Sequence, residues 1–169
     1  MKSSLSKSFL SFLLIYFIII NQVQGWIKCY SGEVSLNLEL TFQTKDDNVN
    51  ATVKDLDIKV YETQIFGTYI YSIYSLTSTK NTPFDWLIET TGPTTPLYGF
   101  SVFGEVSYKI NCTHHRFRHH LCDKTMKFGI PDACLDCYGN PKLCTGAVDL
   151  QQEKSWIRTS PDRNGVPPV

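Results

Sequence analysis

An unbroken alternation of apolar and polar residues runs through Val34-Ser-Leu-Asn-Leu-Glu-Leu-Thr-Phe42. Successive side chains of a β-strand point to opposite faces of the sheet, so a period of two places the five apolar residues on one face. The segment therefore predicts a strand that buries one face in a core and turns the other toward water.

The same signature recurs along the chain. Leu56, Ile58 and Val60 alternate within residues 55–61, and residues 68–77 are rich in the aromatic and β-branched types that favour strands. No stretch of ten or more residues has a helical apolar period. The pattern predicts an all-β, immunoglobulin-like β-sandwich of about seven strands. Further expected strands are 97–103, 106–110, 125–130 and 146–150, with a turn at 46–48 and a proline-punctuated loop at 79–96.

The first 25 residues have the three parts of a secretory signal peptide. Lys2 and Lys7 precede a 12-residue apolar run from Phe9 to Ile20, and the small residue Gly25 stands at the expected cleavage position. A membrane-spanning helix needs about 20 apolar residues, so an uncleaved anchor is the lesser alternative. We predict a secreted, extracellular protein that does not span a membrane. Its expected parts are a signal peptide at 1–25, a β-sandwich domain at 26–156 and a disordered polar tail at 157–169.

The charge balance argues against nucleic acid as a partner. The 169 residues hold 16 basic and 16 acidic side chains; without Lys2 and Lys7 the rest holds 14 against 16, a net charge of −2. Nucleic-acid binding relies on neutralising phosphates and normally requires a basic excess.

Two sequons and six cysteines fit an oxidising, secretory compartment. Asn50 and Asn111 each begin an N-glycosylation acceptor pattern. An even number of cysteines in a secreted chain favours three disulfides over a four-sulfur metal cluster. We expect Cys112 to pair with Cys122, although pairing of each elsewhere stays open. We also expect Cys29 to pair with one of three late cysteines and the other two to pair locally; the three are Cys134, Cys137 and Cys144.

With the strands placed, the chain resembles the nematode transthyretin-like family of secreted β-sandwich proteins. The resembling segments are Gly25–Cys29, Gly99–Glu105, Tyr108–Cys112, Leu121–Lys124, Met126–Pro131 and Gly146–Leu150. Ile110-Asn111 replaces the family's His-Asp pair, and the last three cysteines have no counterpart in it. The resemblance implies a transthyretin-like sandwich. A hydrolytic relative of transthyretin ends in Tyr-Arg-Gly-Ser, which this chain lacks, so that activity is not expected.

All four histidines and two arginines lie between Cys112 and Cys122, in His114, His115, Arg116, Phe117, Arg118, His119 and His120. Three interpretations compete. Imidazoles can bind zinc or copper, but neighbouring histidines on a strand point to opposite faces, so we predict no metal site. The cationic side chains could instead bind a phosphate head group, which the resemblance favours because a member of that family has been linked to anionic lipid on cell surfaces. The third interpretation is a solvated hairpin tip without a ligand.

The sequence carries no catalytic signature. A Gly-x-Ser-x-Gly elbow, a His-Glu-x-x-His pair and a phosphate-binding loop are all absent, so we predict no enzyme and no cofactor. The expected function is non-catalytic extracellular recognition of an anionic lipid head group or a cell-surface partner protein through His114–His120. The alternative is a carrier that holds a small lipophilic ligand in the sandwich against Tyr69, Tyr71 and Tyr74.

Overall fold

The computed structural model describes residues 27–46, 49–112 and 120–160. The predicted signal peptide and His114–His119 lie outside these ranges. Within them, no helix is long and apolar enough to cross a membrane. The described elements are β1 (Glu33–Gln43), β2 (Ala51–Gln64), β3 (Gly67–Asn81), β4 (Phe84–Pro93), β5 (Phe100–Cys112), β6 (His120–Ile130), the 3-10 helix η1 (Asp132–Cys134), β7 (Leu135–Asp136), β8 (Leu143–Asp149) and β9 (Lys154–Thr159).

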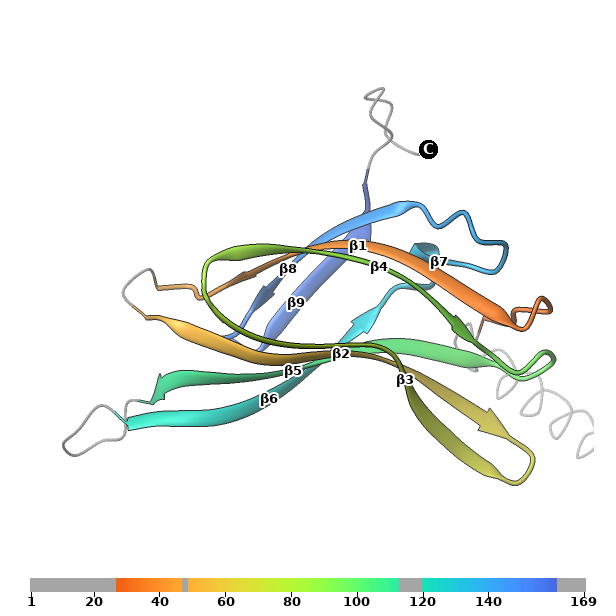
Figure 1. The fold of residues 1–169 in the computed structure, drawn as a ribbon, viewed down its shortest axis with the longest axis horizontal. Coiled ribbons are helices and arrows are strands. Elements are labelled where there is room, and N and C mark those ends of the chain that lie inside the picture. The colour runs from red at the N-terminus through yellow and green to blue at the C-terminus, as the bar shows by residue number, and fades with distance from the viewer. Residues whose placement is uncertain (1–26, 47–48, 113–119, 161–169) are drawn as a thin grey trace, which may run out of the picture.

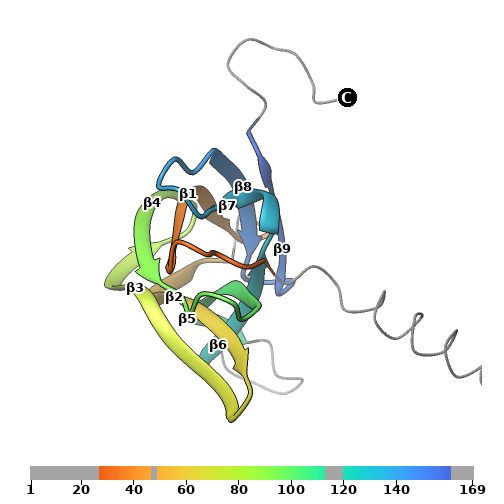
Figure 2. The same ribbon diagram turned by 90° about the vertical axis from the view of Figure 1, so that its right-hand side faces the viewer.

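The strands form two stacked sheets (Figures 1 and 2). One has the order β4-β1-β8-β9, with the two-residue β7 also paired to β1, and the other has the order β3-β2-β5-β6. Neighbouring strands are antiparallel except for β1 and β8, which run parallel. The predicted all-β sandwich is confirmed. It has nine described strands rather than about seven, because β4, β7 and β9 are additional and the two expected segments at 97–110 are one strand, β5.

The core lies between the sheets and follows the period-two pattern of the sequence. All five apolar residues of the alternation that begins at Val34 and ends at Phe42 are fully buried in β1. The hydroxyl of buried Tyr108 donates a 2.9 Å hydrogen bond to the carbonyl of Leu150, which satisfies its one polar atom inside the core. The facing sheet contributes Leu56, Ile58, Val60, Val102, Val106 and Ile110.

The prediction of a loop at 79–96 is wrong, because most of this segment forms strand β4. This strand pairs with β1 over ten residues, from Phe84 opposite Phe42 to Pro93 opposite Glu33. Trp86 and Ile88 face the core while Leu87 is exposed. The prolines that suggested a loop stand at its two ends, where no ladder hydrogen bond from their nitrogen is needed.

Strand β3 forms the edge of its sheet and leans toward β4. Its residues are exposed or only partly buried throughout, unlike those of β2. The hydroxyls of Thr90 and Tyr71 bridge the gap to β4: Thr90 donates to the Ile73 carbonyl at 2.9 Å, and Tyr71 donates to the Pro93 carbonyl at 2.7 Å. These bonds join the two sheets along one side of the sandwich.

The sandwich continues past the expected boundary at residue 156. Strand β9 runs to Thr159, and the backbone N–H of Ser160 donates to the Leu143 carbonyl at 2.9 Å. Residues 157–159 therefore belong to the sheet rather than to the predicted tail. This strand is only six residues long and is followed by a polar segment, so its alternation of apolar and polar residues was not recognised in the sequence.

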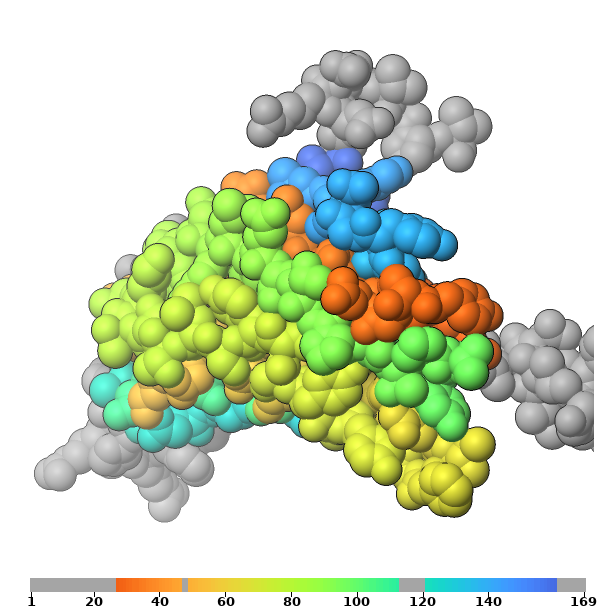
Figure 3. Space-filling model, turned by 45° about the vertical axis from the view of Figure 1, so that its right-hand side comes forward, coloured from red at the N-terminus to blue at the C-terminus, as the bar shows by residue number. Residues whose placement is uncertain are grey.

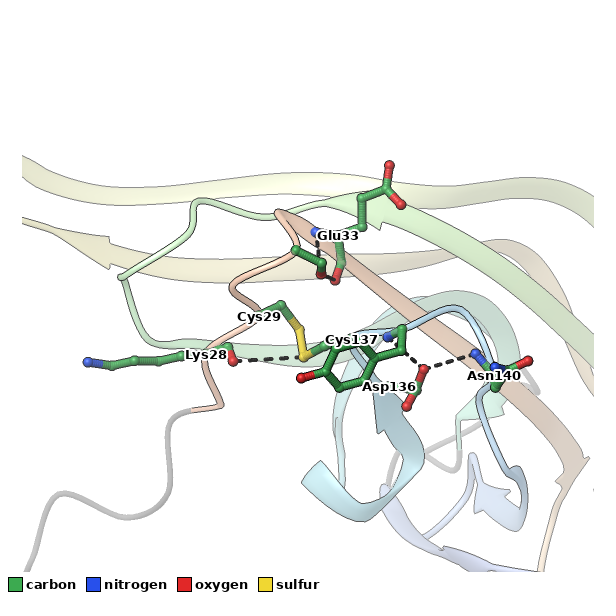
Figure 4. Close-up of a disulfide and its surroundings, with 8 residues drawn as sticks. Lys28, Cys29, Glu33, Asp136, Cys137 and Asn140 are labelled. Atoms are coloured by element: carbon green, nitrogen blue, oxygen red, sulfur yellow. Dashed lines mark hydrogen bonds between the residues drawn. A yellow bond between two sulfur atoms is a disulfide. The ribbon is translucent and has the colours of Figure 1, made fainter.

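Three disulfides join Cys29 to Cys137, Cys112 to Cys122 and Cys134 to Cys144. All three expectations for cysteine pairing are confirmed. The first disulfide closes 108 residues, and in the chain-entropy model a link over such a loop stabilises the fold by about 4–5 kcal/mol. Figure 4 shows this disulfide beside Asp136, whose carboxylate accepts bonds from the backbone N–H groups of Tyr138 and Asn140 and so holds the turn that carries Cys137.

The connections gather at two opposite ends of the sandwich (Figure 1). We call one the Asn50 end; it contains the connections β1–β2, β3–β4, β5–β6 and β8–β9. We call the other the Phe66 end; it contains the segment before β1 and the connections β2–β3, β4–β5 and β6–β8. The Phe66 end is cross-linked by the Cys29–Cys137 disulfide and by a 2.8 Å backbone hydrogen bond from Thr94 to Gly32.

Candidate functional site

The structure describes the base of the predicted binding loop but not the loop itself. Cys112 and His120 form the last residue pair of the β5–β6 ladder, and Cys122 lies opposite Ile110. The Cys112–Cys122 disulfide links the two strands at this point. The residues from His114 to His119, and the side chain of His120, lie outside the description, so the role of this loop stays a prediction.

Both predicted glycosylation sites lie at the Asn50 end. Asn50 and Asn111 are exposed, and the pairing of Ala51 with Ile110 places them at the ends of neighbouring strands. Glycosylation at both sites, which stays a prediction, would place two glycans side by side next to the base of the His-rich loop.

A pocket of about 290 Å³ opens at the Phe66 end, beside the β2–β3 hairpin and the β4–β5 connection. Strand β2 contributes Glu62 and Gln64, β3 contributes Tyr69 and Tyr71, and the chain after β4 contributes Thr94 and Thr95. Of the three predicted tyrosines, Tyr69 and Tyr71 line this pocket, whereas Tyr74 is not among its lining residues and packs partly against the core. Tyr69 and Tyr71 thus border a pocket at one end of the sandwich.

Glu62 is the residue of this pocket that sequence reasoning missed. Its side chain is only 1% exposed, yet three donors reach its carboxylate: the Thr95 backbone N–H at 2.7 Å, the Gln64 amide at 2.7 Å and the Thr95 hydroxyl at 2.8 Å. The signal was available, because Glu62 continues the inward-facing series of Leu56, Ile58 and Val60. An acid at a core-facing position of a regular alternation marks a site for inspection.

The negative charge of Glu62 has no cationic partner among the residues described. The ion pairs found there involve other carboxylates, such as the 2.8 Å pair of Lys59 and Glu105 on the outer face of the β2–β5 ladder. A buried charge without an opposite charge is unusual, since burial removes its hydration. In this pocket, hydrogen bonds alone take the place of that hydration.

Two neighbouring hydroxyls complete the pocket. Burial raises the pKa of Tyr71 to about 12, and the nearby charge of Glu62 acts in the same direction, so the phenol stays neutral and donates to the Pro93 carbonyl. The Thr94 hydroxyl is buried and makes no hydrogen bond within the described structure. Buried polar groups are normally paired, so this hydroxyl is an exception at a residue that lines the pocket.

The described residues hold no group of three or more histidine, cysteine or acidic side chains that could bind a metal ion. All six cysteines are in disulfides, which indicates that the chain folds in an oxidising compartment. The pocket at the Phe66 end brings together a buried carboxylate, two tyrosines and an unpaired hydroxyl. Comparison of the chain with protein-family models, with curated proteins and with solved structures found no match.

Proposed function

We propose that this chain is a secreted, non-catalytic recognition protein of transthyretin-like type that binds an anionic lipid head group on a cell surface through His114–His120. A partner protein at the cell surface is the other ligand this loop could recognise. The proposal is supported by the three disulfides, which fit a secreted protein, and by the position of the flanking pair Cys112 and His120 at one end of the sandwich.

The strand order supports a transthyretin-like sandwich over an immunoglobulin-like one. In constant-type immunoglobulin domains the first two strands are neighbours in one sheet. In this chain β1 lies between β4 and β8, whereas β2 lies in the other sheet between β3 and β5. The separation of β1 from β2 therefore favours the fold that the sequence resemblance implies.

The observation that carries the function is the Cys112–Cys122 disulfide at the base of the loop. It holds the two ends of residues 113–119 at a constant separation, which lowers the entropy lost when the loop orders on a ligand. Arg116 and Arg118 are suited to phosphate oxygens, and histidines with an ordinary pKa of about 6.5 add positive charge in mild acid.

The test is binding to vesicles that contain phosphatidylserine, measured by co-sedimentation at pH 5.5 and pH 7.4. We expect tighter binding at pH 5.5 and a loss of at least about tenfold in the double variant Arg116→Ser/Arg118→Ser. The matched control is Lys45→Ser, which removes an exposed positive charge from the same end of the sandwich and should change binding little. Negligible binding at both pH values would refute the proposal.

A further inference from the structure

The exposed apolar side chains of this protein are concentrated at the Phe66 end. The five most exposed large apolar side chains of the described residues, at 69–92%, all lie in its connections: Tyr30, Ile65, Phe66, Leu97 and Tyr138. Figure 3 shows the β2–β3 hairpin in yellow projecting from the body, below the green β4–β5 connection and the orange segment before β1. Exposed apolar residues gathered in one region mark a binding surface more often than residues scattered singly do.

Leu97 is held in place at a conformational cost. Its φ of 82° lies in the left-handed region that disfavours a leucine, in a turn closed by the bond from the Tyr98 N–H to the Thr95 carbonyl at 3.3 Å. Glycine is the ordinary residue for this position after Pro96. Leucine instead places an apolar side chain, 69% exposed, two residues after the pocket-lining Thr95, and strain of this kind is typical of functional surfaces.

The charge of the Phe66 end indicates which sign of ligand charge it can attract. No charged residue occurs in 63–79 or 93–100, and the segments 28–33, 62–67, 93–100 and 131–142 together hold four acidic and two basic side chains. An anionic bilayer would be repelled by this balance. The pocket near the five exposed apolar side chains, which we call the apolar tips, is lined by the Glu62 carboxylate, which has hydrogen-bond donors but no cationic partner among the described residues. It therefore fits a cation instead.

An ammonium group matches each feature of the pocket. Tyrosine rings attract cations through their π-faces, and Tyr69 and Tyr71 form part of the wall. The Glu62 carboxylate attracts the same charge without giving up its three donors. The unpaired Thr94 hydroxyl can donate to a phosphate oxygen next to the ammonium or accept from an N–H.

We propose that the Phe66 end docks on a zwitterionic phospholipid surface, with the apolar tips in the bilayer interface and the ammonium of a lipid head group in the pocket above Glu62. Insertion of the tips removes apolar surface from water, as for other interfacial proteins. Both sequons lie at the opposite end, so predicted glycans would leave this surface uncovered. The proposal is independent of the His-rich loop, which concerns the other end and the opposite lipid charge.

Co-sedimentation with phosphatidylcholine and phosphatidylglycerol vesicles, at about 0.15 M salt and pH 7.4, tests the surface. In the Arg116→Ser/Arg118→Ser background, which removes the arginines proposed to bind anionic lipid at the other end, the protein should bind phosphatidylcholine at least tenfold more tightly than phosphatidylglycerol. Adding the substitutions Ile65→Ser and Phe66→Ser should lower the affinity for phosphatidylcholine vesicles at least tenfold. The control Leu87→Ser/Leu121→Ser removes two exposed leucines outside the Phe66 end and should bind as the wild type does. Matching thermal midpoints and circular dichroism would show that each variant is folded.

Glu62→Gln tests the pocket, because glutamine keeps the shape and removes the charge. This variant should retain residual binding through the apolar tips but lose the preference for phosphatidylcholine. Millimolar phosphocholine should compete with the vesicles for the wild-type protein. Equal binding to both vesicle types in the Arg116→Ser/Arg118→Ser background, full binding by the Ile65→Ser/Phe66→Ser variant, or a preference that survives Glu62→Gln would overturn the proposal. If the protein bound free phosphocholine but not vesicles, its ligand would be a free small molecule rather than a lipid surface, and the proposal would also be overturned.

Discussion

The buried carboxylate of Glu62 in β2 accepts a 2.7 Å hydrogen bond from the backbone N–H of Thr95, which lies 33 residues later in the β4–β5 connection. Strand β2 belongs to one sheet and β4 to the other, so this bond joins the two layers at the Phe66 end. The same carboxylate also accepts from the Thr95 hydroxyl and from Gln64. One side chain therefore positions the connection that carries Leu97.

Replacing Glu62 by leucine should destabilise the fold by about 1–3 kcal/mol, because three donors lose their acceptor and the Thr95 N–H is left buried. Glu62→Gln should cost less, since its amide oxygen can still accept from Thr95. The free energy of unfolding in urea measures both effects. Glu39→Gln, an exposed substitution on β1, is the control and should stay within about 0.5 kcal/mol of the wild type. A Glu62→Leu variant as stable as the wild type would contradict the role assigned to this network.

Gly104 in β5 lies directly under the ring of Phe128 in β6, its cross-strand partner. A Cβ atom at position 104 would lie 2.1 Å from the ring, inside any real contact distance. Gly104→Ala should therefore displace the buried ring and destabilise the fold by about 1–3 kcal/mol, as overpacking does.

Gly129→Ala is the matched control for this substitution. Gly129 stands beside Phe128 in the same strand, and an added Cβ there would meet nothing within 4 Å. Thermal unfolding of the two variants should show a lowered midpoint for Gly104→Ala only. A comparable loss in both would mean that strand propensity, rather than contact with the ring, sets the cost.

Glu105 accepts from Lys59 at 2.8 Å and lies 3.3 Å from Lys127 on the outer face of the sheet. The hydrogen bond from Lys59 holds the pKa of Glu105 below its ordinary value, and the same bond raises the pKa of Lys59. The stabilisation from Glu105 is therefore complete above its unfolded pKa of about 4.5 and is lost as pH falls through the lower folded value. The stabilisation from Lys59 is complete below its unfolded pKa of 10.5 and is lost as pH rises through its higher folded pKa.

Urea unfolding at pH 7 and pH 3 tests this dependence. Because the pair is partly exposed, Glu105→Gln should lower stability by about 0.5–1 kcal/mol at pH 7. The difference from the wild type should shrink at pH 3. The exposed Glu89→Gln should match the wild type at both pH values. A Glu105→Gln deficit that is unchanged at pH 3 would show that the carboxylate charge is not its cause.

Much of the sandwich could be predicted because alternation is a local property. The five buried positions of β1 follow directly from a period of two, and the same holds for Leu56, Ile58 and Val60 of β2. The pairing of Cys112 with Cys122 could also be expected, since a short hairpin brings them together. Strand β4 was hidden because Pro83 and Pro93 at its ends imitate the punctuation of a loop.

The sequence by itself therefore determined the all-β class, the core-facing residues of β1 and of part of β2, and the expectation of three disulfides, whereas the choice of Cys137 as the partner of Cys29 came from the tertiary structure. Only the tertiary structure decided which sheet each strand joins, which connections share an end, and that Glu62, Tyr69 and Thr94 line one pocket. The physical reason is the separation along the sequence of the residues that must meet. A strand and its buried face are set by neighbours two residues apart, whereas the pocket depends on contacts between segments about 30 residues apart that meet only when both sheets have closed around the core.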